Sequence, residues 1–263
     1  MLILLPPSEG KTAGTEAPLD WEQLSLPALN PARERVLDTL VTLCGDDPDR
    51  ARQVLGLTPG QGCEVTRNAG LRTAPTGAAS EIYTGVLYEA LDLASLEVGA
   101  RKLADESVLV GSGLWGMVRL TDRIPAYRCA IGVRLPGLGG LTAYWRKALA
   151  AELARVAGDE PVLDLRSAAY GATWRPTGEV AGRTASVRVL HERMVDGTAT
   201  RSVVSHFNKA TKGRLVRDLL AAEVQPSSVG ELVTALRDLG YVVEEPAPVA
   251  GRPLLLDVIV TEI

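Results

Sequence analysis

Short apolar runs alternate with longer amphipathic segments along the chain, and this alternation constrains the fold more than any other feature. Residues 2–5, 107–110 and 161–165 are brief apolar runs typical of buried strands. Residues 30–43 and 141–157 have apolar side chains at helical spacing. Strands that alternate with helices predict an α/β or α+β protein with a mixed sheet.

The remaining segments extend this prediction. We expect an irregular connection over residues 57–80, an interrupted helix over 80–96, two hairpin strands at 185–190 and 202–207 joined around 196–197, a helix capped by Asn208, a helix opened by Ser228 and Glu231, and strands at 241–244 and 254–261. Because 263 residues approach the limit for one hydrophobic core, we expect a single compact domain over residues 1–263.

Composition excludes several classes of protein. With 46% hydrophobic and 23% charged residues, the chain is neither a disordered protein nor a coiled coil. It contains no apolar run of the roughly 20 residues that a membrane span needs. The opening MLILL runs into two prolines and does not resemble a signal peptide, and the three cysteines are widely scattered. We therefore expect a cytoplasmic, monomeric protein with reduced thiols, no metal site and no cofactor.

Lysine is rare in this chain. Of the 28 basic residues only five are lysines, at positions 11, 102, 147, 209 and 212. Since arginine cannot replace a compact, titratable amine, each lysine in a special context is a candidate functional residue. A solvated surface position is the alternative for each.

The segment Pro6–Thr12 (PPSEGKT) ends like a phosphate-binding loop. The Walker motif needs a glycine five residues before Gly10, where Leu5 stands, and no helix pattern follows, so the motif is excluded. Lys11 and Thr12 still qualify as donors to a phosphate or carboxylate. The alternative is an ordinary surface turn.

Residues 111–134 combine a glycine-rich turn with four arginines and two aromatic residues. Arg119, Arg123, Arg128 and Arg134 are opposed only by Asp122, and Trp115 and Tyr127 are interleaved with them. This combination suits phosphate pairing and base stacking. A solvated basic face with Trp115 in the core explains it equally well.

Residues 201–217 form a second basic segment, with five cations and no acid before Asp218. Lys209 and Lys212 stand at helical i, i+3 spacing, and Arg214 follows them. Cations near a helix start are unfavourable unless an anion binds there. We predict that the basic parts of the two segments, residues 119–134 and 209–214, converge with Lys11 on one concave face.

Two further segments carry candidate sites. Residues 135–145 (LPGLGGLTAYW) resemble half of a helix-hairpin-helix DNA-binding element, in which backbone N–H groups at a helix start bind a phosphate; a plain glycine loop is the alternative. Asp164, Ser167 and Tyr170 follow the strand PVLDL, where open α/β sheets place ligands.

Taken in order, several segments resemble the YaaA family of peroxide stress proteins. They are LILLPPSEGKT at the N-terminus, IYTGVLYEAL (82–91), VGSGLWGMVRLTDRIPAYRCAIGVRL (110–135), AYWRKAL (143–149), VLDLRSAAY (162–170) and SHFNKATKGRLVRDL (205–219). The resemblance implies a compact α/β fold with a positively charged cleft and a helix-hairpin-helix-like element. It also implies DNA binding and protection from hydrogen peroxide through lower free iron and less DNA damage. The matching cleft residues are Lys11, Arg119, Arg123, Arg128, Lys209, Lys212 and Arg214. Tyr127, which lies among these arginines, is a further candidate binding residue.

Two classes of function remain open at this stage. In the first, the protein binds the DNA backbone through a local basic cleft, which a net charge of −4 makes weak and sensitive to salt. In the second, the same cleft is the active site of an enzyme for a nucleotide, a nucleobase or another small anion. Lys11 and Tyr170 are then the candidate catalytic residues. A narrow, closed pocket favours the second class.

Overall fold

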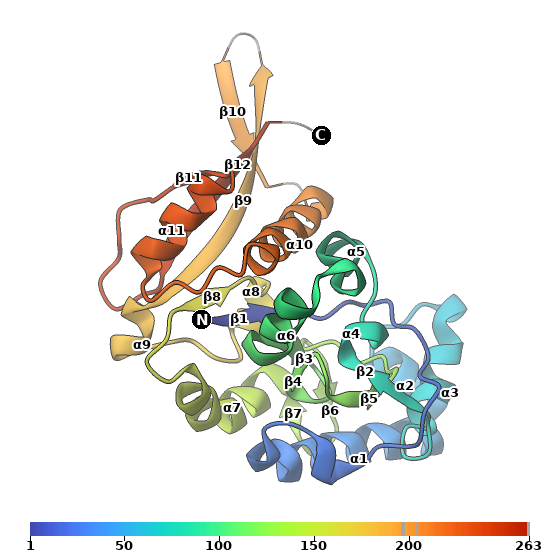
Figure 1. The fold of residues 1–263 in the computed structure, drawn as a ribbon. Helices are drawn as coiled ribbons and strands as arrows, with labels where there is room; N and C mark the ends of the chain where they lie inside the picture. The colour runs from blue at the N-terminus through green and yellow to red at the C-terminus, as the bar shows by residue number, and fades with distance from the viewer. Residues whose placement is uncertain (196–197, 204, 262–263) are drawn as a thin grey trace.

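A mostly parallel β-sheet forms the centre of the protein (Figure 1). The structure, a computed structural model, describes residues 1–195, 198–203 and 205–261. The strands of this sheet are β1 (Leu2–Leu5), β3 (Val108–Ser112), β4 (Gly116–Arg119), β8 (Val162–Asp164), β9 (Thr184–Val195), β10 (Thr198–Ser202), β11 (Val242–Glu244) and β12 (Leu254–Val260). They lie in the order β11-β12-β9-β8-β1-β3-β4, and β10 pairs with β9.

The five inner strands run in one direction. β1 is parallel to both β3 and β8, β8 is parallel to β9, and β9 is parallel to β12. The outer strands β4, β10 and β11 are antiparallel to their neighbours. All four residues of β1 are buried, as expected for a strand covered on both faces. The predicted mixed sheet is confirmed.

Helices surround the sheet. They are α1 (Asn30–Asp46), α2 (Pro48–Val54), α3 (Gly62–Ala69), α4 (Ala79–Ile82), α5 (Val86–Leu91), α6 (Val98–Ser107), α7 (Leu141–Ala157), α8 (Ala168–Gly171), α9 (Gly178–Gly182), α10 (Ser205–Ala221) and α11 (Val229–Asp238). The helix α1 begins at the predicted Asn30-Pro31, and α7 spans the predicted residues. The helix α11 starts with Ser228, whose hydroxyl accepts the N–H of Glu231.

Two predicted elements differ from the structure. Residues 57–80, predicted as an irregular connection, contain the helix α3, which packs against α1 through Val65. The helix α10 begins at Ser205, so Asn208 lies inside its first turn and does not cap it. The pairing of β9 with β10 confirms a hairpin, although its turn at 196–197 lies outside the described residues. The second strand was misplaced: it spans 198–202, and residues 205–207, predicted as strand, belong to α10.

The helix-hairpin-helix prediction is wrong in its first half. The glycine-rich segment forms a short antiparallel pair, β6 (Arg134–Leu135) and β7 (Gly139–Gly140), from which α7 starts directly. Residues 126–133, which precede the pair, contain turns and no helix. A second small pair joins β2 (Thr76–Ala78) to β5 (Arg123–Pro125).

The glycine-rich turn after β3 is shaped by packing. Gly116 has a φ of +72°, and a Cβ there would lie 2.6 Å from ring atoms of Trp145. Trp115 and Trp145 are both fully buried. The turn therefore needs glycine because a tryptophan of α7 packs directly against its backbone.

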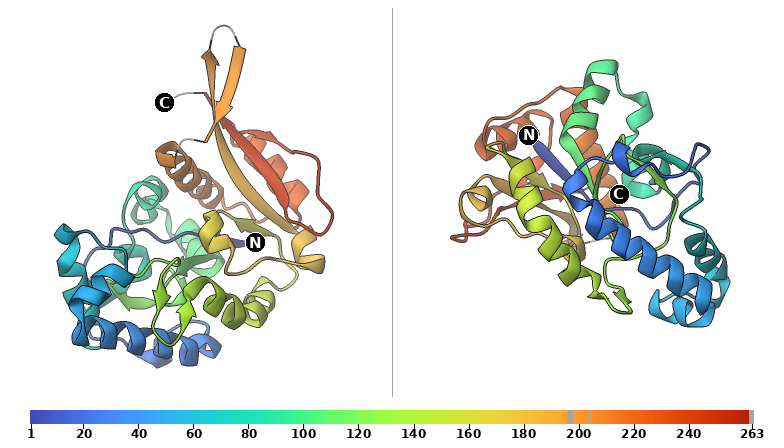
Figure 2. Two further views of the ribbon diagram at one scale, coloured as in Figure 1. Left: turned by 180° about the vertical axis from the view of Figure 1, so that it is seen from behind. Right: turned by 90° about the horizontal axis from the view of Figure 1, so that it is seen from below.

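The arrangement of elements leaves one edge of the sheet for a site. The parallel strands β1, β3 and β8 end at the same edge, and α10 packs beside α5 and α6 and against β9. The strands β9 and β10 extend beyond the body of the molecule, as Figure 1 and the left view of Figure 2 show.

Candidate anion-binding site

A cavity of about 480 Å³ lies at the carboxyl ends of β1 and β8. The chain leaves β1 toward β3 on one side and leaves β8 toward β9 on the other, so the two connections diverge at this point. Such a switch point is where open α/β sheets bind ligands. The lining residues are Pro6, Pro7, Ser8, Glu9, Gly10, Thr84, Gly85, Val86, Leu87, Tyr88, Leu165, Ser167, Tyr170, Asn208, Lys209 and Lys212.

The turn after β1 forms one wall and is held by short hydrogen bonds. The Ser8 hydroxyl donates to the Gly10 carbonyl over 2.6 Å and accepts the Thr84 N–H over 3.0 Å. The Tyr88 hydroxyl donates to the Pro6 carbonyl over 2.7 Å. These contacts connect the turn to the segment that opens α5, so the two segments are held together along the cavity.

Arg128 fixes the same turn from behind. Its guanidinium donates to the Glu9 carboxylate at 2.9 Å and to the Glu9 carbonyl at 3.2 Å. The backbone of Arg128 is held in turn by Asn68, whose side-chain amide accepts its N–H and donates to its carbonyl. Arg128 therefore neutralises Glu9, the one carboxylate that lines the cavity.

The loop after β8 is organised by a buried ion pair. Arg166 donates to both oxygens of Asp164 over 2.9 and 2.7 Å, and its side chain is fully buried. It also donates to the carbonyls of Tyr170 and Trp174. Asp164, a predicted site residue, therefore holds the loop that carries Ser167 and Tyr170 into the cavity lining.

Tyr170 forms part of the opposite wall, above the end of β3. A Cβ at Gly111 would lie 3.2 Å from Cδ1 of Tyr170, so the ring rests on a glycine. Burial raises the pKa of Tyr170, and Tyr83 and Glu9 raise it further. The phenol stays protonated at neutral pH and can donate a hydrogen bond.

Two lysines of α10 provide the positive charge of the cavity. Lys212 is 8% exposed, and its ammonium donates to the Leu165 carbonyl over 3.1 Å. Desolvation lowers the pKa of Lys212, and Asp164 opposes this shift. Lys209 lies one turn earlier on the exposed side of the cavity lining. In the described part of the chain, neither ammonium forms an ion pair with a carboxylate.

Lys11 lies behind the turn and does not line the cavity. Its ammonium donates to the Ser8 carbonyl over 2.7 Å and stands 4.4 Å from the ring centre of Tyr127. Although Lys11 is partly exposed as a residue, desolvation of its ammonium lowers its pKa to about 8, against the opposing effect of Glu9. Lys11 thus supports the turn from beneath.

Tyr127 connects this lysine to a buried chain of hydroxyls. The Tyr127 hydroxyl lies 2.6 Å from Ser112 Oγ and 3.0 Å from the hydroxyl of Tyr83. Tyr127 is 2% exposed and Trp115 is fully buried, so neither ring can stack on a base. Burial in the core is therefore the correct explanation for both aromatic residues.

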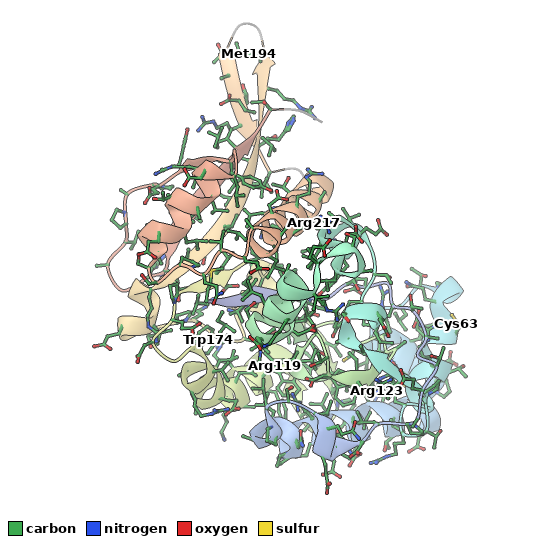
Figure 3. The ribbon with its side chains drawn as sticks, viewed as in Figure 1. Cys63, Arg119, Arg123, Trp174, Met194 and Arg217 are labelled. Atoms are coloured by element: carbon green, nitrogen blue, oxygen red, sulfur yellow. The ribbon has the colours of Figure 1, made fainter. Side chains whose placement is uncertain are left out.

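Besides Lys11 and Arg128, three predicted cations lie outside the cavity lining. Arg119 donates to the Glu106 carbonyl over 2.6 Å, and Arg123 pairs with Glu16. Figure 3 labels both arginines. Arg214 is exposed and close to Tyr241. Of the two basic segments that were predicted to converge, only 209–212 lines the cavity, and Arg128 is the one arginine of 119–134 that touches its wall.

Several residues of the site escaped the sequence analysis. Tyr88 and Thr84 contribute through contacts with the turn after β1, more than 70 residues away in sequence. Arg166 follows Asp164 by two residues, and this spacing at a strand end was the available signal. No sequence signal marked Asn68, because its role depends on a contact with Arg128, 60 residues later.

The described residues form neither a cluster of metal ligands nor a membrane-spanning helix. Across residues 1–195, 198–203 and 205–261, no three His, Cys, Asp or Glu side chains are placed to hold a metal ion. Within the same ranges no helix has the length and apolar character to cross a membrane. The chemistry that the cavity does offer is a pair of ammonium groups, several hydroxyls and two tyrosine rings, a combination suited to a small anion.

Comparisons with known proteins give a consistent result. A family model described as peroxide stress protein YaaA matches residues 1–247. "UPF0246 protein SCO2297" of Streptomyces coelicolor is 61% identical over the full length of both chains. "UPF0246 protein CE1889" of Corynebacterium efficiens is 42% identical over 93% of this chain and 95% of its own. A UPF0246 protein of Shewanella pealeana is 26% identical over 97% of this chain and 98% of its own.

Proposed function

Because this chain belongs to the YaaA family of peroxide stress proteins, we propose that it serves peroxide defence in the cytoplasm by binding a small phosphate-bearing molecule in the cavity between β1, β8 and α10. A volume of about 480 Å³ lies within the range of small-molecule sites. A nucleotide or a purine-like metabolite with a phosphate group is the class of ligand that this volume and lining suit best.

The observation that carries this proposal is the pair of lysines without carboxylate partners. A cation such as Lys212, 8% exposed, is costly to bury unless an anion compensates it. A phosphate that binds Lys209 and lies beside Lys212 supplies that anion and replaces lost hydration with charge-assisted hydrogen bonds. Glu9, the only lining carboxylate among the described residues, is neutralised by Arg128 and does not repel the ligand strongly.

DNA binding is the second candidate, favoured by the exposed cations of α10. Lys209 and Arg214 are exposed and, among the described residues, have no carboxylate partner. A duplex laid along α10 would contact them through its backbone, without base readout. In this case the protein would limit iron-dependent damage by covering DNA, and binding would weaken steeply with salt.

A thermal-shift screen separates the two candidates. The purified protein is heated with inorganic phosphate, pyrophosphate, mononucleotides, nucleobases or a short DNA duplex. We expect the small phosphate-bearing compounds to raise the melting temperature and Lys212→Met to abolish the rise. Stabilisation by the duplex alone, lost in Lys209→Met combined with Arg214→Met and retained in Lys212→Met, would favour DNA binding. Arg119→Met is the control, since Arg119 lies outside the cavity.

A further inference from the structure

The cavity contains an amine placed for covalent chemistry. Resting on the proposed function, we propose that Lys212 is a nucleophile that forms an imine with the carbonyl group of a small phosphorylated aldehyde or ketone. The phosphate of that ligand is bound by Lys209, and the carbonyl carbon reaches Lys212 deeper in the cavity.

The surroundings of Lys212 lower the pKa of its ammonium and so increase the share of neutral amine. Its single hydrogen-bond partner in the described structure is a carbonyl, that of Leu165, at 3.1 Å. Asp164 is the carboxylate that acts on it electrostatically, but both oxygens of Asp164 are held by Arg166. The ammonium form of Lys212 therefore lacks a counterion of its own, while its residue is 8% exposed.

The cavity lining contains a second lysine of the same helix. Lys209 precedes Lys212 by three residues on α10, so the two side chains share one face of the helix. Burial and a neighbouring positive charge are the two conditions that activate a lysine for attack on a carbonyl carbon. Desolvation lowers the pKa of Lys212 in agreement with this geometry.

The reaction balances without a redox partner. The lone pair of the neutral Lys212 amine attacks the carbonyl carbon, a C–N bond forms, and the carbonyl π electrons move to oxygen, which takes up a proton. The resulting carbinolamine then expels its hydroxyl group as water after a second protonation, and nitrogen gives up both of its protons overall. Amine and carbonyl thus yield one imine and one water. Tyr170 and Ser167, which line the cavity, are the hydroxyl donors available to the carbonyl oxygen.

Lys102 and Lys147 are the controls for Lys212, because both are exposed and lie outside the cavity lining. Lys11 is not a control, since desolvation lowers its pKa to about 8. Lys11 lies against the Tyr127 ring and outside the cavity lining. Lys102 faces solvent and lies 3.9 Å from Glu106, and Lys147 is exposed on α7. Lys209 is exposed at the cavity. With five lysines in the chain, every site of modification can be assigned by peptide mapping.

The test uses pyridoxal 5′-phosphate as a phosphorylated aldehyde and borohydride to reduce the imine to a stable amine. The native full chain is treated with a limiting amount of the probe, reduced, digested and mapped by mass spectrometry. We expect Lys212 to be labelled at least about tenfold faster than Lys102 or Lys147, since a neutral amine is the reactive form. Pyrophosphate in excess should suppress this labelling, and Lys212→Arg should remove it while Lys209→Arg retains it.

Pyridoxal, which lacks the phosphate, separates failure of this inference from failure of the proposed function. Slower labelling of Lys212 by pyridoxal than by pyridoxal 5′-phosphate supports both the imine and the phosphate site. Equal labelling by the two aldehydes without protection by pyrophosphate overturns the phosphate site and with it the phosphorylated substrate. Labelling of Lys212 no faster than that of Lys102, in a protein that pyrophosphate still stabilises, overturns the imine and leaves the anion site. Mapping the unmodified sequence keeps the test valid even where Lys212→Arg does not fold.

Discussion

Replacement of Lys11 by methionine should change how the stability of the protein depends on pH. The ammonium of Lys11 lies against two tyrosine rings, and desolvation lowers its pKa from 10.5 to about 8 in the folded protein. Between these values the unfolded chain binds more protons at this site than the folded chain. Because of Lys11, the free energy of unfolding therefore increases as the pH rises through this range. Below about pH 8 this increase is absent.

The size of the gain follows from the shift. One pKa unit corresponds to about 1.4 kcal/mol, so Lys11 adds at most about 2 kcal/mol between about pH 7 and about pH 9.5. This is an upper value, because the partly exposed stem of Lys11 gives water some access to the site. Methionine keeps the apolar stem and removes the titrating group.

Urea denaturation of both proteins at the two pH values measures the effect. The wild type should gain more stability with rising pH than Lys11→Met, and the difference should approach the stated value. Lys102→Met, at an exposed position, should follow the wild type. Parallel changes in wild type and Lys11→Met would refute the desolvation of Lys11.

Three further predictions concern the thiols, the buried ion pair and the tyrosine wall. Iodoacetamide should modify the exposed Cys63 in the native protein and spare the two buried thiols, whose pKa values burial raises to about 11 and about 12, as peptide mapping will show. Arg166→Met leaves the carboxylate of Asp164 without its partner and should lower the free energy of unfolding by about 3 kcal/mol in a urea titration, whereas an unchanged midpoint would contradict the buried pair. Gly111→Ala places a methyl group 3.2 Å from the Tyr170 ring. The rise in melting temperature caused by pyrophosphate should therefore be smaller than in the wild type, and this loss should exceed the drop in melting temperature of the ligand-free protein.

The fold was predictable where local patterns are strong. The strand β1 is a continuous apolar run ended by two prolines, and α7 has a regular apolar face, so both were located from the sequence. The helix α3 was missed because glycine and threonine dominate its surroundings, and only packing against α1 stabilises it there. The start of α10 was misplaced by three residues because Asn208 is a favourable cap in isolation.

The site was predictable only in part, because charge patterns do not reveal partners. Lys209 and Lys212 were selected from helical spacing, and the structure places both at the cavity. Arg123 looked equally free in the sequence, yet it pairs with Glu16, which lies more than 100 residues away. Tyr127 lies among arginines in the sequence, but in the structure it is buried and its hydroxyl contacts those of Ser112 and Tyr83. Such long-range contacts leave no periodic signal in a single sequence.

The most direct test of the central claim is isothermal titration of the protein with pyrophosphate. The account predicts binding at one site per chain, weakened at least about tenfold, or about 1.4 kcal/mol, in each of Lys209→Met and Lys212→Met. Arg119→Met and Arg123→Met should bind like the wild type, because these arginines lie outside the cavity. Affinity that is unchanged in the lysine variants, or lost in the arginine variants, would contradict a pocket whose charge comes from α10.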